Sequence, residues 1–309
     1  MIGIICAMKI EADAIRETLT SPVCETVSGI EFTRGVLHGK EVVMAVSGVG
    51  KVFAAICTEV MILRYAPSLV LNSGVGGTLT PALSIGDIAV ATSLVQHDMD
   101  TSAIGDPVGL VSGINKIYFE ADKDAVARLC AAADKVGART LCGPIASGDQ
   151  FLADGARKRF IADTFSAIAC EMEGASVARV ADEFHVPCAI LRCMSDKADG
   201  IAHDTYAFNY TEASNTSASV VKEMLNTIAK DRVALPAAKD VATKDTTPRT
   251  AIISAMSVEL KALVDAADIQ KETVIGSKTY YVGKLNGEDV VLVQAGVGKV
   301  LSANYTAAL

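Results

Sequence analysis

Short apolar runs rich in β-branched residues alternate along this chain with longer segments of helical periodicity. The expected strands are residues 2–7, 41–48, 68–74, 86–96, 139–148, 167–172 and 188–196. The expected helices are residues 9–19, 50–64, 122–137, 153–163, 174–184 and 209–230. Several of the strands are apolar throughout, which is typical of a sheet that is covered on both faces. The alternation therefore predicts an α/β fold with helices packed on a mostly parallel sheet.

The beginning of this pattern occurs a second time near the end of the sequence. From residue 251, "AIISAMSVELKALVDA" resembles "GIICAMKIEADAIRET" from residue 3, and "VVLVQAGVGKVLSA" resembles "VVMAVSGVGKVFAA". Both pairs are offset by 248 residues, so the two copies align without a gap. A segment rich in Ala, Lys, Asp and Thr separates them and is typical of a linker. We expect a complete domain at 1–231, a linker at 232–249 and a truncated second copy at 250–309, too short to close a sheet of its own.

Charge and cysteine usage exclude several classes of protein. The 309 residues carry a net charge of −8, which argues against a surface for nucleic acids. The eight cysteines include no C-x-x-C pair and often lie inside apolar runs, which favours free thiols in a reducing compartment. The first apolar run lacks a preceding basic region, and no window approaches the length of a membrane span. We therefore expect a cytoplasmic protein that binds neither nucleic acid nor membrane.

Two kinds of glycine-rich segment follow expected strands. The tetrapeptide "GVGK" stands at 48–51 and 296–299, but Ala45 and Val52 replace the Gly and Ser/Thr of a phosphate-binding P-loop. The segment "NSGVGGTL" at 72–79 lacks the spacing of a dinucleotide site. Both are expected to form turns, which either offer backbone N–H groups to a small ligand or allow close helix packing. We expect no cofactor.

Metal and nucleophile motifs are weak in this sequence. His97 has Asp98 and Asp100 beside it, but a metal site needs more neutral donors at workable spacing, so we expect a polar loop there and no metal. The sequence holds no G-x-S-x-G motif and no cysteine with an evident histidine partner. Catalysis by a serine or cysteine nucleophile is therefore not expected.

Carboxylates remain as the catalytic candidates. These acids are Glu11, Asp149, Glu171, Glu173, Asp196 and Asp199. Glu173 and Asp196 lie just past the carboxyl ends of expected strands, where ligands of α/β sheets collect. Glu171 is sufficiently explained as a helix-start acid, and Asp149 and Asp199 are interpreted as structural. Paired carboxylates suit acid–base cleavage of a glycosidic bond.

The ordered set of motifs resembles one family. "IGIICAMKIEAD", "SGVGKVFAA", "NSGVGGTL", "GDIAVATSLVQHDMD", "SGDQFL", "CEMEGASVARVA" and "LRCMSDKAD" together are similar to the 5′-methylthioadenosine/S-adenosylhomocysteine nucleosidases of the nucleoside phosphorylase superfamily. The likeness covers about residues 1–231, with a partial match from 251 to 309. It implies a single nucleoside phosphorylase-like domain, with a mixed central sheet flanked by helices, that works as a homodimer on a nucleoside and water without a cofactor.

The resemblance also implies roles for individual residues. Asp196 is similar to the general acid that protonates the purine at N7, and Glu11 to the base that activates water. Glu173 is expected to hold the ribose hydroxyls, while Met172 packs on the sugar. The remaining substrate-binding residues that the resemblance implies are Val75, Gly76, Phe151, Leu152, Arg192, Ser195 and Tyr206.

Three alternatives remain open. A phosphorylase of the same fold would use phosphate in place of water, but the acid in "IICAMKIEAD" and the absence of a base in "NSGVGGTL" favour hydrolysis. A related hydrolase would act on another nucleoside, such as aminodeoxyfutalosine. The tandem layout also fits a nucleoside-binding or regulatory module without catalysis.

Overall fold

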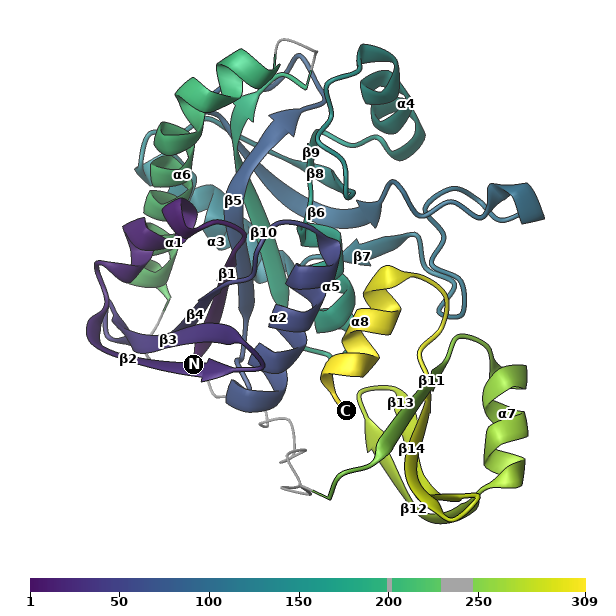
Figure 1. Cartoon of the computed structure of the whole chain (residues 1–309). Helices are drawn as coiled ribbons and strands as arrows, with labels where there is room; N and C mark the ends of the chain where they lie inside the picture. The colour runs from purple at the N-terminus through teal and green to yellow at the C-terminus, as the bar shows by residue number, and fades with distance from the viewer. Residues whose placement is uncertain (199–201, 229–246) are drawn as a thin grey trace.

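The computed structural model shows an α/β molecule in which a large sheet is flanked by helices (Figure 1). It describes residues 1–198, 202–228 and 247–309, and gives only the backbone of residues 202–208. The strands of the large sheet are β1 (Ile2–Cys6), β2 (Thr20–Val27), β3 (Ile30–Leu37), β4 (Lys40–Val46), β5 (Val70–Thr78), β6 (Ile88–Gln96), β7 (Tyr118–Glu120), β8 (Thr140–Ser147), β9 (Ala169–Glu171) and β10 (Cys188–Asp196). The helices around it are α1 (Lys9–Arg16), α2 (Lys51–Tyr65), α3 (Lys123–Lys135), α4 (Gly155–Phe165), α5 (Gly174–Glu183) and α6 (Ala202–Thr227), with a short 3₁₀ helix η1 (Ser102–Ile104).

The sheet is mixed, as the family resemblance implies. Its order is β10-β6-β8-β9-β5-β1-β4-β3-β2, with β7 beside β6. The pairs β1–β4, β1–β5, β5–β10, β6–β8 and β8–β9 are parallel. The pairs β2–β3, β3–β4, β5–β9, β6–β7 and β6–β10 are antiparallel. The mostly parallel sheet expected from the alternation alone is therefore wrong, and the mixed sheet is confirmed.

One part of the sheet closes on itself. Strand β10 pairs with β5 on one side and with β6 on the other, so β5, β10, β6, β8 and β9 form a closed circuit. Gly77, near the end of β5, pairs with Cys170 of β9 and with Asp196 at the end of β10, so the ends of these three strands lie close together at one rim of this circuit. That rim holds the side chains described in the next subsection.

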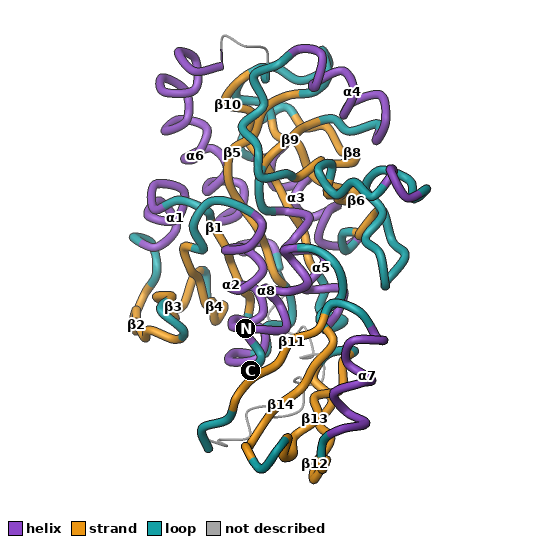
Figure 2. Tube along the Cα trace, turned by 45° about the vertical axis from the view of Figure 1, so that its right-hand side comes forward, coloured by secondary structure: helices purple, strands orange, loops and turns teal. Residues whose placement is uncertain are grey.

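The helices form two layers. Helices α1, α3 and α6 pack with one another over one face, and α2 and α5 pack together over the opposite face (Figures 1 and 2). Each layer buries its own apolar cluster: Ile15, Leu129 and Val221 belong to the first, and Met61 and Val180 to the second. No helix in the described part of the chain has the length and apolar character needed to cross a membrane.

Strands β2 and β3 were not expected from the sequence. Strand β2 contains Pro22 and exposes most of its residues, so it lacks the apolar signal of a covered strand. It lies at the edge of the sheet, where a proline is tolerated. The short strand β7 was also missed, and α6 begins at Ala202, whereas the periodicity predicted its start at residue 209.

Residues 250–309 repeat the opening elements of the chain. The second series is β11 (Thr250–Ser254), α7 (Ser257–Ala266), β12 (Asp268–Ile275), β13 (Lys278–Leu285), β14 (Glu288–Gln294) and α8 (Lys299–Ala307). Its four-stranded sheet has the order β11-β14-β13-β12, which matches β1-β4-β3-β2 in the first series. The elements α7 and α8 correspond to α1 and α2. The division into a domain, a linker and a second copy stays a proposal, and most of the expected linker at 232–249 lies outside the described residues.

Candidate active site

A cleft opens at the rim where β5, β9 and β10 meet. Three acids from separate parts of the chain line it. Glu11 lies in the first turn of α1, Glu173 stands at the start of α5, and Asp196 is the last residue of β10. They are only 3%, 5% and 3% exposed, respectively. The fold thus gathers the three carboxylates that the sequence analysis singled out into one cavity.

Most of the other predicted site residues line the same cleft. They are Val75, Gly76, Phe151, Leu152, Met172 and Ser195. Two predicted residues are not among the described lining residues: Arg192 lies behind the cleft wall, and the side chain of Tyr206 lies outside the described residues. The lining residues that the sequence analysis missed are Ala7, Met8, Val49, Gly77, Gln150 and Cys170, and Glu171, which it interpreted as a helix-start acid only, lines the cleft as well. Several of these residues are next to a recognised motif in the sequence, and this proximity is the signal that could have identified them as lining residues.

Backbone N–H groups hold Glu11 from two elements. Its Oε2 accepts hydrogen bonds from the N–H groups of Ala7 and Met8, each at 2.9 Å. Its Oε1 accepts one from the N–H of Val75 on β5, at 3.1 Å. Burial raises the pKa of the Glu11 carboxyl, while Arg192 and these three N–H groups act to lower it. Glu11 is thus fixed between α1 and β5 with a raised proton affinity.

The glycines of "NSGVGGTL" belong to strand β5, so the turn predicted at 72–79 is wrong. The strand continues through Val70–Thr78, and its glycines leave room for Glu11 and Asp196, which pack closely against it. A Cβ atom at Gly74 would lie 2.6 Å from Oε1 of Glu11, and one at Gly77 would lie 2.8 Å from Oδ1 of Asp196. The "GVGK" segment does form the expected turn, in which Gly48 and Gly50 have φ angles of 91° and 104°.

The close approach at Gly74 yields a test. Gly74→Ala is expected to displace Glu11 and so to lower kcat/KM of whatever reaction the cleft catalyses by at least about tenfold. The free energy of unfolding is expected to fall by about 1–3 kcal/mol, the usual cost of overpacking. Gly155→Ala is the matched control, because its nearest neighbour would be 3.8 Å away, on the flexible Arg159 side chain. Steady-state kinetics and thermal unfolding of both variants provide the measurement. Equal behaviour of the two variants would contradict the account of Gly74.

Asp196 is held by its own neighbours. The hydroxyl of Ser195 donates to Oδ2 of Asp196 at 3.0 Å, and the N–H of Ala198 donates to Oδ1 at 2.8 Å. The carboxylate is therefore oriented from both sides at the end of β10. Ser195, which the resemblance placed among the substrate-binding residues, lines the cleft and also orients Asp196.

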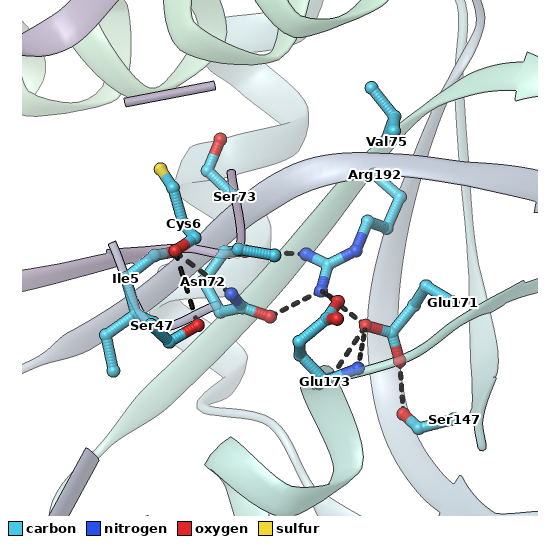
Figure 3. Close-up of polar contacts among 12 residues, drawn as sticks. Ile5, Cys6, Ser47, Asn72, Ser73, Val75, Ser147, Glu171, Glu173 and Arg192 are labelled. Carbon is cyan, nitrogen blue, oxygen red and sulfur yellow. Dashed lines mark hydrogen bonds and ion pairs between the residues drawn. The ribbon is translucent and has the colours of Figure 1, made fainter. Parts of the chain in front are cut away.

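Arg192 lies behind the cleft and joins the acids of the α5 start (Figure 3). Its guanidinium donates to the backbone oxygen of Asn72 at 3.2 Å, and to its side-chain oxygen at 2.5 Å. It also forms an ion pair with Glu171 and lies 3.7 Å from Oε2 of Glu173. Because Arg192 does not line the cleft, direct contact with a substrate is not supported; its geometry fits positioning of Glu171 and Glu173.

The two glutamates that flank Met172 differ in their surroundings. Oε2 of Glu171 accepts the N–H groups of Glu173 and Gly174, at 2.9 and 2.7 Å, which caps the start of α5 as expected. Oε1 of Glu173 accepts the N–H of Gly50, at 2.8 Å, so the first glycine turn reaches this acid. Burial, followed by the nearby charge of Glu171, raises the pKa of Glu173 to about 8, although Arg192 opposes this. Glu173 thus holds its proton more tightly than an exposed glutamate does.

The expected loop is present, because His97–Asp100 follow β6 outside any strand or helix, but His97 itself is buried. Burial lowers the pKa of its imidazole. Neither ring nitrogen has a hydrogen-bond partner among the described residues, and the ring packs against Gly148. Within the described residues, no group of three or more His, Cys, Asp or Glu side chains is arranged to hold a metal ion.

Comparisons with known proteins bear on this site. The chain matches the family model of the Phosphorylase superfamily over residues 1–226 and 249–309. It is 40% identical over 228 residues to the aminodeoxyfutalosine nucleosidase of Helicobacter pylori strain J99, covering 73% of this chain and 98% of that relative. It is 34% identical over 229 residues to the 5′-methylthioadenosine/S-adenosylhomocysteine nucleosidase of Staphylococcus haemolyticus, covering 74% of this chain and 100% of that relative.

Solved structures give the same picture. The nucleosidase of Helicobacter pylori in complex with butyl-thio-DADMe-Immucillin-A aligns with a TM-score of 0.71 at 39% identity, covering 74% of this chain and 98% of that one. The nucleosidase of Neisseria meningitidis in complex with methylthio-immucillin-A aligns with a TM-score of 0.71 at 31% identity, covering 74% and 99%. Both matches span nearly the whole of the solved chain.

Proposed function

This chain belongs to the phosphorylase superfamily, and from that premise we propose that it hydrolyses the N-glycosidic bond of 5′-methylthioadenosine and S-adenosylhomocysteine. The products are adenine and the 5-thio-substituted ribose. The bond that breaks joins C1′ of the ribose to N9 of the purine, and a water molecule supplies the new oxygen on C1′. The enzyme is therefore an N-glycosyl hydrolase.

We propose Asp196 as the general acid. Adenine that leaves as an anion is a poor leaving group, and protonation at N7 makes it neutral. Asp196 lies in the cleft, and its contacts with Ser195 and Ala198 hold the carboxyl group in one orientation. A fixed proton donor contributes to rate because it acts as the leaving group takes up negative charge.

We propose Glu11 as the group that positions and activates water. Its raised pKa makes it a better base than an exposed glutamate, and its three backbone partners keep it in place. As water adds to C1′, Glu11 accepts the proton that the water loses. The cleft position of Glu11 beside Val75 supports this assignment.

Glu173 and Met172 are proposed to bind the ribose. With its pKa raised to about 8, Glu173 is largely protonated near neutral pH and holds the ribose hydroxyls through hydrogen bonds. An oxocarbenium-like transition state places positive charge on the sugar, which ionised acids of the cleft stabilise more than they stabilise the ground state. Met172 lines the cleft and offers an apolar surface that does not compete for hydrogen bonds. Phe151 and Leu152 are proposed for the adenine side, and Val75, Gly76 and Ser195 for contacts around the ribose, water and Asp196.

One observation carries the choice of water over phosphate. The charged residues that line the cleft within the described part of the chain are all acids, namely Glu11, Glu171, Glu173 and Asp196. The nearby Arg192 is engaged by Asn72, Glu171 and Glu173 behind the wall. A dianionic phosphate would meet no cation among these lining residues, and the acids that are ionised there would repel it, whereas they would not repel water or an uncharged nucleoside.

Adenine release with and without phosphate tests this function. We expect turnover of 5′-methylthioadenosine in phosphate-free buffer, and no increase when phosphate is added. The measurement is the liberated adenine together with the sugar product, which is the free 5-thio-ribose after hydrolysis and its 1-phosphate after phosphorolysis. Turnover that requires phosphate would overturn the proposal.

A second substrate is favoured by one comparison. The aminodeoxyfutalosine nucleosidase of Helicobacter pylori is 40% identical to this chain, against 34% for the Staphylococcus haemolyticus nucleosidase. We propose that aminodeoxyfutalosine is a further substrate of the same cleft. Comparison of kcat/KM for the three nucleosides on one preparation decides their order.

The remaining assignments rest on the sequence and the family. A homodimer is proposed because the resemblance implies it, and a cytoplasmic location because the cysteines favour free thiols in a reducing compartment. The second copy is proposed to lack activity of its own, because Glu259 repeats Glu11 but residues 250–309 hold no counterpart of Glu173 or Asp196. The non-catalytic alternative is therefore kept for the second copy and set aside for the first.

A further inference from the structure

Helix α8 packs against α2, the helix of which it is the copy (Figures 1 and 2). Val300, Leu301 and Tyr305 of α8 are buried and belong to the same apolar cluster as Met61 of α2 and Val180 of α5. The second copy thus covers the outer face of the α2–α5 layer. Burial of these large side chains gives the contact a substantial apolar contribution.

Buried polar groups match across this contact. The guanidinium of Arg179 on α5 forms an ion pair with Glu183 at 2.7 Å, and donates to the hydroxyl of Tyr305 at 3.3 Å. Glu183 in turn accepts the N–H of Ser277, in the β12–β13 turn, at 2.6 Å. Tyr305 and Arg179 are each 1% exposed. A charged pair buried with specific partners from the second copy indicates a built interface rather than a chance contact.

The second copy also contacts the segment next to the cleft. Nζ of Lys299, at the start of α8, forms an ion pair with Oδ2 of Asp149. Oδ1 of Asp149 accepts the N–H of Lys51 at 2.8 Å, and the Asp149 N–H donates to Asp98 at 3.0 Å. The residues that follow Asp149 are Gln150 and Phe151, which line the cleft. Lys299 therefore contacts Asp149, the residue that connects Gln150 and Phe151 of the cleft wall to the start of α2.

We propose that residues 250–309 act as a partner subunit within the same chain, covering the α2–α5 face and holding Asp149 through Lys299. In a two-fold interface between identical subunits, a surface element packs against the same element of the partner. The α2–α8 contact is similar, because α8 is the second copy of α2. The face is then closed to a second chain, so the homodimer that the resemblance implies would have to form through another face. Lys299 is a positioning residue, since it acts on the cleft through Asp149. The positioning role of Lys299 rests on the proposed nucleosidase function, whereas the interface between α2 and α8 does not.

Cross-linking of the full chain tests the interface. A carbodiimide joins an amine and a carboxylate that are in direct contact, and so is expected to link Lys299 to Asp149. Equal amounts of ¹⁴N- and ¹⁵N-labelled chains are mixed, unfolded, refolded together and cross-linked, and the linked peptides are analysed by mass spectrometry. We expect the two peptides of each Lys299–Asp149 link to carry the same isotope, which shows that they come from one chain. The Lys116–Asp182 pair within the first copy serves as the reference, since Nζ of Lys116 lies 2.8 Å from Oδ2 of Asp182. Mixed pairs, or no Lys299–Asp149 link where Lys116–Asp182 is found, would overturn the proposal.

Kinetics of the full chain test the positioning role. Lys299→Ala is expected to raise KM by roughly two- to fivefold with little change in kcat, because the pair is partly exposed and such pairs are worth little. Lys299→Arg is expected to restore KM. Lys261→Ala is the matched control, since Lys261 is an exposed lysine of α7 that pairs with Asp265 at 2.7 Å. If Lys299→Ala and Lys261→Ala have the same KM, the positioning role is wrong. An inactive parent chain would contradict the nucleosidase function and leave the cross-linking result to decide the interface.

Discussion

Asp196→Asn is expected to lower kcat for adenine release by about 10²–10⁴-fold, the range that general acid catalysis contributes. The amide retains the size of the carboxyl group; its single oxygen can accept the hydrogen bond from the N–H of Ala198, and its NH2 group can donate to the hydroxyl oxygen of Ser195. It has no acidic proton to transfer to N7. Affinity for a non-hydrolysable nucleoside analogue is therefore expected to change far less than kcat. Steady-state kinetics and calorimetric titration with the analogue measure the two quantities.

The control for this variant is Asp163→Asn, which alters an exposed aspartate of α4 that does not line the cleft. We expect its kinetics to match those of the parent chain. Thermal unfolding of both variants separates a loss of chemistry from a loss of fold. Near-normal turnover by a folded Asp196→Asn protein would remove Asp196 as the acid.

Glu11→Gln is the second change with a large expected effect. A glutamine offers one oxygen, so it cannot accept from Ala7, Met8 and Val75 as the carboxylate does, and it cannot take a proton from water. We expect kcat to fall by about 10²–10⁴-fold, as for loss of a general base. A stability loss of about 1–3 kcal/mol should accompany it, because a buried backbone donor loses its partner.

The repeat supplies a matched control for Glu11. Glu259 stands 248 residues later in the corresponding position and accepts the N–H of Met256 at 2.9 Å, as Glu11 accepts that of Met8. Glu259 is exposed and belongs to a copy without the other two acids. Glu259→Gln is expected to leave kcat unchanged. If both substitutions reduce kcat alike, the loss at Glu11 reflects the helix start and not catalysis.

The sequence predicted the elements with strong apolar signals and missed those without them. Every strand expected in residues 1–231 is present, because covered strands must be apolar on both faces. Strands β2 and β3 escaped because β2 is largely exposed and the pair extends the sheet at its edge. The antiparallel pairing of β10 with β6 depends on long-range packing, which periodicity along the chain does not report.

The candidate site was predictable to the extent that its members belong to local motifs. Glu11, Glu173 and Asp196 were named from motifs, and the structure adds that they share one cleft. The strand conformation of the glycines in β5 was not predictable, because it depends on acids that approach from α1 and β10. The engagement of Arg192 by Asn72 and Glu171 was likewise hidden, since these residues meet only after the closed circuit of strands forms.

The shorter sheet described above has one consequence for handling the protein. In the first series β1 is hydrogen-bonded on both sides, by β4 and β5, whereas β11 pairs with β14 alone among the described strands. One side of β11 therefore presents a row of amide and carbonyl groups without strand partners, and such a row can recruit another polypeptide by backbone pairing. At high protein concentration the chain is expected to self-associate through the edge of β11 before it loses catalytic activity.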